Sequence, residues 1–325
     1  MENLNNQPES SSQHDSNFEK EILAKLAFAS VNEQRRTRRW NIFFKALFAA
    51  YFAVLILLVY LPGGSAKVSD SSEHTGLVDL QGVISAGSDA NADTVVSGLR
   101  AAFKADHSKA VILRINSPGG SPVQSGYIND EIIRLRKKYP NKKLYAVIAD
   151  ICASGGYYVA SAADEIYADK ASVVGSIGVL MNGFGFVKGM EKLGIERRLY
   201  TAGESKGFLD PFTEAKPEDI KHIKGLLKNI HEQFIAVVKQ GRGERLTKGN
   251  KLFTGYVWTG EESVELGLID GLGSSSYVAR EIVGAEEIVD YTPRPDFLEK
   301  FADRLGASIS NFALDTFKDA SPQLR

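Results

Sequence analysis

The sequence is poor in the residues that build disulfides, metal sites and histidine-based catalysis. Among its 325 residues there is one cysteine, Cys152, so the chain can form neither an internal disulfide nor a zinc site from its own thiolates. The five histidines lie in the N-terminal tail, a linker, a polar turn and a helical stretch. None of them follows a glycine-rich strand end. We therefore expect no metal and no cofactor.

An excess of positive charge is also missing. The chain has 39 Lys and Arg against 40 Asp and Glu, a net charge of −1, so we expect no nucleic-acid partner. Apolar residues make up 43% of the chain, which is typical of a globular protein with a sizeable core.

One long apolar run stands near the N-terminus. Residues 42–61 are interrupted only by Lys45, and 20 helical residues span about 30 Å, the thickness of a bilayer core. Four arginines lie between residues 35 and 39, and only Lys67 follows soon after the run. The positive-inside rule then predicts a single transmembrane anchor at 42–61, with the N-terminus in the cytoplasm and the rest of the chain outside.

Two other readings of this run remain open. It could be a buried core helix, or the apolar part of a cleavable signal peptide with a cleavage site at Gly64-Ser-Ala66. The preceding 1–41 segment reads as a cytoplasmic tail, disordered over 1–17 and helical over 18–34. Residues 62–75 read as a linker.

Residues 76–290 alternate between strand and helix patterns, which predicts a parallel sheet covered by helices. The expected strands are 76–84, 109–116, 143–150, 165–168, 172–174 and 195–201. The expected helices are 91–103, 127–138, 154–163, 217–239 and 274–283, and a short capped helix follows Thr259. A loose apolar stripe makes 291–325 an amphipathic C-terminal tail.

The most informative stretch runs from Asp150 to Ser161. Ser154 follows an apolar strand and precedes two glycines and a helix pattern, where backbone N–H groups converge and a substrate can come close. This placement suits a nucleophilic serine, although a plain tight turn has the same local sequence. Cys152 is a rival thiol nucleophile, but a small buried residue at a strand end is the commoner role.

A serine nucleophile needs a base, and the histidines are poorly placed for a Ser-His-Asp triad. Lys206 is a better candidate, because it follows a predicted strand, stands between two glycines and precedes Phe208. Apolar surroundings favour the neutral amine that a base must have. The second glycine-rich loop, 117–121, also follows a strand and is expected to face 154–156, where it can present an N–H group to an oxyanion.

Four motifs occur in order and together identify a resemblance. They are Ile115-Asn-Ser-Pro-Gly-Gly120, Ala153-Ser-Gly-Gly-Tyr-Tyr158, Val174-Gly-Ser-Ile-Gly-Val179, and Thr259-Gly260 with Gly267-Leu-Ile-Asp-Gly271. Over residues 75–285 the chain resembles the signal peptide peptidase A (SppA) family of membrane-anchored serine proteases, in its short single-domain form. The resemblance implies the ClpP/crotonase-like α/β fold, with repeated β-β-α/β-α units.

The resemblance also implies roles for individual residues. Ser154 matches the nucleophile, Lys206 the general base, Ser176 the serine that orients the lysine, and Gly119 or Gly120 with Gly155 the oxyanion donors. It further implies a homo-oligomeric ring in which serine and lysine can come from neighbouring subunits. The expected substrates are cleaved signal peptides and other apolar peptides, degraded at the outer face of the bacterial inner membrane.

Two functions of other classes remain open. An acyl-CoA enzyme could use the same fold, although the anchor and the serine within its glycine motif argue against this. A non-enzymatic anchored scaffold for membrane proteins is the second alternative.

Overall fold

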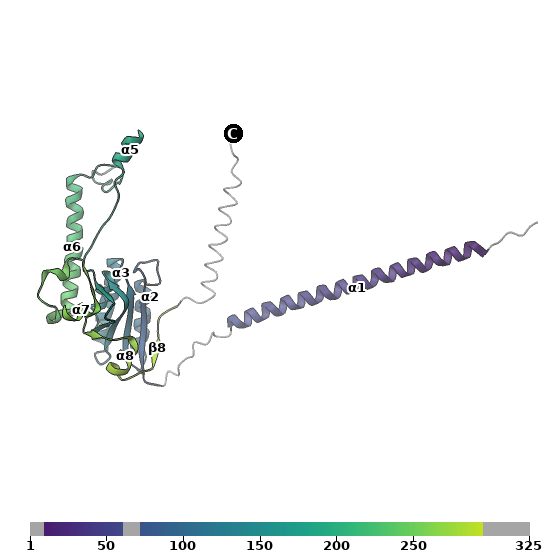
Figure 1. Ribbon diagram of the computed structural model, residues 1–325, viewed down its shortest axis with the longest axis horizontal. Coiled ribbons are helices and arrows are strands. Elements are labelled where there is room, and N and C mark those ends of the chain that lie inside the picture. The colour runs from purple at the N-terminus through teal and green to yellow at the C-terminus, as the bar shows by residue number, and fades with distance from the viewer. Residues whose placement is uncertain (1–9, 61–71, 295–325) are drawn as a thin grey trace, which may run out of the picture. The chain divides into compact units, whose positions relative to one another are not determined.

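The computed structural model describes residues 10–60 and 72–294, which fall into two units (Figure 1). The first unit contains helix α1 (Ser10–Tyr60). The second unit, Val68–Asp296, contains the sheet and the remaining described helices. The predicted linker 62–75 and C-terminal tail 291–325 lie largely outside the described residues.

Helix α1 is continuous, and its side chains from residue 31 to residue 54 are exposed. Residues 10–17, for which disorder is expected from the sequence, form its first turns. Once a helix is nucleated, each further residue adds one hydrogen bond, so a polar segment can continue it. Within the described part of the chain, no helix combines the length and apolar character needed to cross a membrane. The predicted span 42–61 ends on Leu61, outside that part, and the anchor stays a prediction.

The second unit is built on one sheet of eight strands: β1 (His74–Gln81), β2 (Ser108–Ser117), β3 (Leu144–Ala153), β4 (Glu165–Ala168), β5 (Val173–Gly175), β6 (Val257–Thr259), β7 (Gly271–Leu272) and β8 (Ile288–Asp290). The order is β6-β5-β3-β2-β1-β8, and β4 pairs with both β3 and β7. Every pair is parallel except β5 with β6. This mixed α/β architecture with a mainly parallel sheet fits the predicted ClpP-like fold.

Most helices of this unit follow the predicted pattern with shifted ends, and α5 has no predicted counterpart. They are α2 (Ala92–Lys104), α3 (Pro122–Lys138), α4 (Gly155–Ala160), α5 (Val187–Leu193), α6 (Pro217–Arg242), α7 (Gly260–Glu265) and α8 (Ser275–Tyr277), with 3-10 turns at Gly243–Arg245 and Asn250–Phe253 and a π-helical turn, η3, at Val278–Val283. Thr259 caps α7 as expected, because its hydroxyl accepts the Glu262 N–H and the Glu262 carboxylate accepts the Thr259 N–H.

Successive side chains of a strand point to opposite faces of the sheet, and both faces are buried here, as is usual for parallel sheets. In β2, Val111, Leu113 and Ile115 belong to the larger core, which includes residues of α2, α3 and α4. Ile112 belongs to the smaller core on the opposite face, where Val278 of η3 packs. The carboxyl ends of β2, β3 and β5 meet at one edge, and this edge carries the candidate site.

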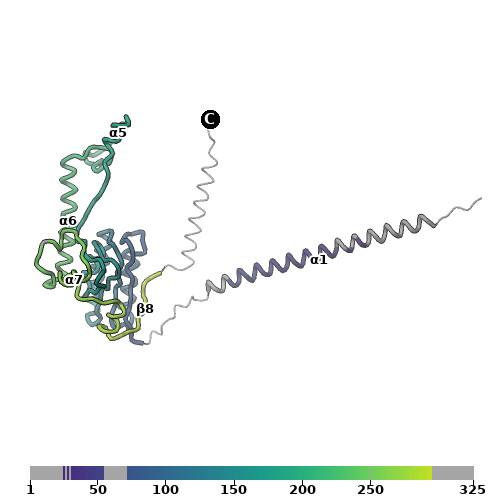
Figure 2. The backbone as a smooth tube through the Cα atoms, viewed as in Figure 1, coloured from purple at the N-terminus to yellow at the C-terminus, as the bar shows by residue number. Residues whose placement is uncertain are grey.

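Residues 178–216, which we call the arm, leave this body and return through α6. Figures 1 and 2 show the chain running out to α5 and coming back along α6 toward the sheet. A cavity of about 830 Å³ in this region is lined only by residues between 181 and 227. The predicted strand at 195–201 is wrong: this stretch lies in the arm and pairs with no strand of the described chain.

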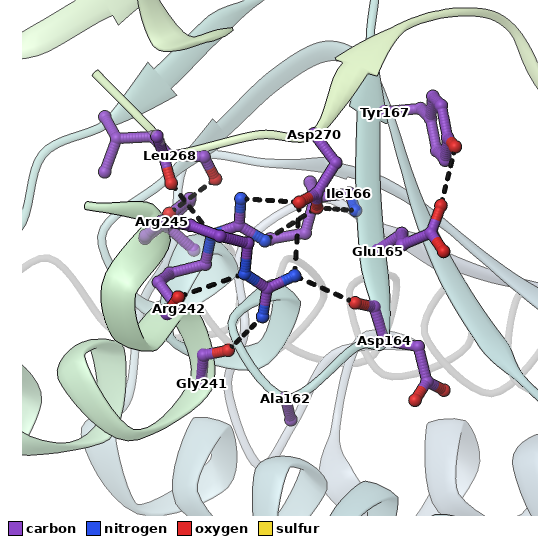
Figure 3. A network of polar contacts seen from close by, with 12 residues as sticks. Ala162, Asp164, Glu165, Ile166, Tyr167, Gly241, Arg242, Arg245, Leu268 and Asp270 are labelled. Carbon is purple, nitrogen blue, oxygen red and sulfur yellow. Dashed lines mark hydrogen bonds and ion pairs between the residues drawn. The ribbon is translucent and has the colours of Figure 1, made fainter. Parts of the chain in front are cut away.

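An ionic cluster fastens the C-terminal end of α6 to the body (Figure 3). Arg242 is buried and binds both carboxylate oxygens of Asp270, at 2.7 and 3.1 Å, and its Nε donates to the Gly267 carbonyl. Arg245 and the Ile166 N–H also donate to Asp270. Burial alone would raise the pKa of Asp270, but the hydrogen bonds and positive charge of Arg242 outweigh it and lower that pKa.

Candidate active site

Ser154 occupies the junction between β3 and α4 in an unusual backbone conformation. Its φ is 51° and its ψ −122°, a region that costs a non-glycine residue about 1–3 kcal/mol and is typical of functional sites. Its N–H donates to the Gly175 carbonyl at 2.8 Å, and the residue is half-buried. The end of β3 thus holds this serine at the sheet edge in a strained turn.

The two glycine-rich loops face each other, as the sequence predicts. A Cβ added to Gly119 would lie 2.8 Å from the Ser154 Cβ and 2.6 Å from the Gly155 nitrogen. A Cβ added to Gly120 would lie 2.1 Å from the Ile84 carbonyl oxygen. Side chains at these two positions would collide with backbone, so the close approach of the loops depends on glycine.

Two neighbouring N–H groups in these loops are available to a ligand. The Gly119 N–H already donates to the Ser117 hydroxyl, which donates in turn to the Gly82 carbonyl. The Gly120 N–H has no acceptor among the described residues, and the Gly155 N–H opens α4, where no intrahelical acceptor exists. A Cβ added to Gly155 would lie 3.2 Å from the Gly120 nitrogen, so these groups are close. The geometry favours Gly120 with Gly155, rather than Gly119, as a pair of oxyanion donors.

Ser176 stands on the turn beside Ser154. Its φ is 50°, its N–H donates to the Tyr256 carbonyl at 2.7 Å, and it follows Gly175, whose carbonyl accepts the Ser154 N–H. Both serines are half-buried, so their hydroxyl-bearing turns are adjacent and accessible at the edge of the site. Of the described residues other than glycine, only Leu209 shares their positive φ.

Lys206 lies in the arm and is exposed. Its N–H donates to the Gly203 carbonyl, and its side chain makes no hydrogen bond or ion pair with the described residues. The cavity in this region involves only the arm and α6, and no hydrogen bond joins Lys206 to Ser154 within the described chain. The structure therefore brings Ser154, Ser176, Gly120 and Gly155 together but leaves Lys206 apart from them.

The rival nucleophile and base are disfavoured by their surroundings. Cys152 is fully buried, and burial raises the pKa of its thiol, which disfavours the reactive thiolate; its packing in the core is confirmed. Among the described histidines, none is hydrogen-bonded to Ser154: His74 bonds to Tyr291, and His231 bonds to the Ile177 carbonyl. Residues 10–60 and 72–294 also contain no cluster of three metal-binding side chains.

The sequence signals missed two contributors to this site. Tyr256 accepts the Ser176 N–H with its backbone carbonyl, a role open to any residue in that place and therefore without a signature. His231 lies on α6, far from the glycine motifs in the sequence, and only the fold brings its ring to Ile177.

Residues 136–288 match the model of the family described as Peptidase family S49. This region of the chain belongs to the S49 family, and the relatives that it matches include SppA peptidases. The chain is 30% identical over 184 residues to the putative signal peptide peptidase SppA of Enterococcus faecium, covering 57% of this chain and 53% of that protein. It is 33% identical over 273 residues to Protease 4 of Haemophilus influenzae, covering 79% and 43%.

A third relative carries a different name. The chain is 47% identical over 186 residues to the Na(+)/H(+) antiporter NhaA of Brucella abortus, covering 57% of this chain but only 25% of that protein. The chain thus spans between a quarter and about half the length of these three relatives. Most of the antiporter lies outside the region shared with this chain.

Proposed function

We propose that the chain is a serine endopeptidase that cleaves apolar peptides with a Ser-Lys dyad. One observation carries the proposal: Ser154 is held at a strained strand end beside the N–H groups of Gly120 and Gly155. Two donors next to a nucleophile can stabilise the oxyanion of a tetrahedral intermediate, which is a large part of catalysis in acyl transfer. Membership of the S49 family supports the same reading.

In the proposed reaction, the neutral amine of Lys206 takes the proton of Ser154 while Oγ attacks the peptide carbonyl carbon. The oxyanion accepts hydrogen bonds from Gly120 and Gly155. The lysine ammonium then protonates the leaving amine as the C–N bond breaks, which leaves an acyl ester on Ser154. Water hydrolyses this ester, and Ser176 holds the lysine amine in position.

We propose that Lys206 serves the Ser154 of a neighbouring subunit in a homo-oligomeric ring. Within one chain the two residues lie on different parts of the unit, and the arm that carries Lys206 exposes large apolar side chains. The resemblance to SppA proteases allows the same exchange. A second subunit would supply both the surface that covers the arm and the serine that the lysine activates.

The proposed site of action is the outer face of the bacterial cytoplasmic membrane. Residues 42–61 would anchor the chain as a single span, with residues 35–39 on the cytoplasmic side and the peptidase unit outside. Residual signal peptides are the proposed substrates, because they are apolar and remain at the membrane. The name of the Enterococcus faecium relative supports this substrate class.

The test is digestion of a synthetic signal peptide by the full chain in detergent micelles, with cut sites read by mass spectrometry. We expect Ser154→Ala and Lys206→Ala each to lower kcat at least about 10³-fold, since a nucleophile and its base act as a unit. Cys152→Ser is the matched control and should keep its activity, because the thiol is buried away from the reaction.

Normal turnover by a folded Ser154→Ala protein would rule out the nucleophile assignment. Absence of cleavage by the wild type, together with binding of an acyl-CoA, would favour the acyl-CoA enzyme. Absence of both, with no labelling of Ser154 by a fluorophosphonate, would favour a scaffold.

A further inference from the structure

The turn that carries Ser176 is hydrogen-bonded to the backbone of the proposed nucleophile, Ser154. The Gly175 carbonyl accepts the Ser154 N–H at 2.8 Å, so any shift of this turn moves the backbone of Ser154. On one side the segment that leads into β6 holds the turn: the Tyr256 carbonyl accepts the Ser176 N–H at 2.7 Å, and a Cβ added to Gly178 would lie 3.0 Å from the Gly255 Cα.

Helix α6 holds the turn from another direction. The Nε2 atom of His231 lies 3.2 Å from the carbonyl oxygen of Ile177, the residue after Ser176. A carbonyl oxygen can only accept, so Nε2 carries the hydrogen and donates it. The ring is half-buried, and this bond persists whether the imidazole is neutral or protonated, because Nε2 is a donor in both forms.

The same face of α6 also contacts the helix that follows the nucleophile. Phe234, three residues after His231, is buried and packs on Tyr158 of α4 with ring centroids 5.2 Å apart. The Tyr158 N–H donates to the Ser154 carbonyl at 3.0 Å. One turn of α6 therefore contacts both serine-bearing segments, the Ser176 turn through His231 and the α4 helix through Phe234.

We propose that His231 is a positioning residue for the peptidase reaction. Its N–H fixes the Ile177 carbonyl, which sets the Ser176 turn and, through Gly175, the orientation of Ser154. It transfers no proton. The expected effect on kcat rests on the proposed function. The hydrogen bond to Ile177 gives this histidine of α6 a role at the site.

Kinetics on the full chain test the proposal. In His231→Ala the turn loses one hydrogen bond, and we expect kcat for signal-peptide cleavage to fall about five- to tenfold with little change in KM. In His231→Gln a side-chain amide N–H can donate to the same carbonyl without titrating. This variant should recover most of the wild-type kcat and keep the wild-type pH profile.

Glu232→Ala is the matched control, because Glu232 is the exposed neighbour on α6 and should leave kcat unchanged. All variants are compared at temperatures below their melting points, with circular dichroism as the check on folding. If His231→Gln falls as far as His231→Ala while both stay folded, the imidazole itself is needed and the positioning role is wrong. Wild-type kcat in His231→Ala would overturn the proposal as well.

A second measurement does not depend on turnover. Backbone amide hydrogen exchange at Ser154 and Ser176 should be about five- to tenfold faster in His231→Ala than in the wild type, and close to wild type in His231→Gln. Equal exchange in all three proteins would overturn the positioning role. If the wild type cleaves no peptide but exchange responds as expected, the proposed function fails while the positioning of Ser154 by His231 stands.

Discussion

The two halves of α6 differ in their surroundings, although one amphipathic pattern runs through both. In the C-terminal half, Phe234, Val238 and Arg242 are buried against the body of the same chain. In the N-terminal half, Ile220 and Leu226 are exposed. The 26-residue helix is about 39 Å long at 1.5 Å per residue, and its C-terminal half packs on α4 through Phe234. An apolar helix face predicts burial, but it does not tell which molecule covers it.

The arm continues this contrast. Leu180 is 80% exposed, Phe184 82% and Tyr200 90%, whereas the central strands of the body bury almost every apolar side chain. Several large exposed apolar residues within one segment are more than the single ones that a soluble surface normally carries, and they favour an interaction surface. The body covers most of its own apolar side chains, whereas the arm leaves large ones exposed, and this supports the proposed contact with a second subunit.

The strongest test of this contrast mixes two inactive proteins. If Lys206 serves the Ser154 of the next subunit, equal amounts of Ser154→Ala and Lys206→Ala chains form some intact pairs. Random assembly around a ring of heterologous interfaces should restore about a quarter of the wild-type activity. Peptide cleavage after co-refolding or subunit exchange measures this directly.

The control is each inactive variant mixed with itself. A mixture that stays at the level of the separate variants, while sedimentation shows mixed oligomers, would mean that serine and lysine act within one chain.

The next largest expected effect is on stability, at the C-terminal end of α6, where Arg242 binds Asp270. Asp270→Asn leaves the buried Arg242 guanidinium without its counter-charge, which should lower the free energy of unfolding by about 3–5 kcal/mol. Denaturant titration of the body measures the loss. Glu281→Gln breaks an exposed pair with Arg280 and should cost less than about 1 kcal/mol. Equal losses in the two variants would show that the Arg242 cluster does not fasten the helix.

The pH dependence of the same variant sharpens the result. Because the folded-state pKa of Asp270 lies below its unfolded value, its stabilisation is complete above the unfolded pKa and is lost as the pH falls through the folded pKa. The difference in stability between wild type and Asp270→Asn should therefore shrink on acidification. A difference that stays constant with pH would contradict this sign.

The smallest expected change in stability belongs to the arm. Leu180→Ser and Tyr200→Ser remove exposed side chains, so the unfolding free energy of the isolated subunit should change by less than about 0.5 kcal/mol. The same changes should weaken oligomerisation and lower activity. Sedimentation and peptide cleavage at several protein concentrations measure both. Unchanged assembly would show that these two residues contact no neighbour.

The body of the fold was predictable because its strands are continuous apolar runs bounded by turn residues. β2 and β3 begin and end within a few residues of their predicted limits, and β4 has its predicted bounds. Helix α5 and strand β8 were not predicted. Each is short, seven and three residues, and carries too little periodicity to stand out from a loop.

The failure at 195–201 has a different cause. Ile195, Leu199 and Tyr200 favour a strand, but a strand also needs an edge to pair with, and the arm leads this stretch away from the sheet. The β-propensity of a stretch depends on its residue types, whereas strand pairing depends on whether the fold places another strand beside it.

The site was predictable to the extent that it follows from strand ends. Ser154 and the loop 117–121 lie where the parallel-sheet rule places them. The choice between Gly119 and Gly120 was not predictable, because it depends on which N–H the Ser117 hydroxyl occupies. The distance between Lys206 and Ser154 was also beyond the sequence, since 52 residues of spacing fit either one chain or two.

The division of β3 between two partners has a consequence for how the domain opens. The first part of β3 pairs with β4, from Tyr145 to Ile148, and the last part pairs with β5, from Ile151 to Ala153. In the described sheet, β4 is followed only by the two-residue strand β7, so few backbone hydrogen bonds hold this edge. Local unfolding of β7 and β4 need not extend to Ile151, because from there on β3 is paired with β2 on one side and β5 on the other. Ser154 can therefore keep its position when the β3–β4 pairing, a few residues earlier in β3, opens.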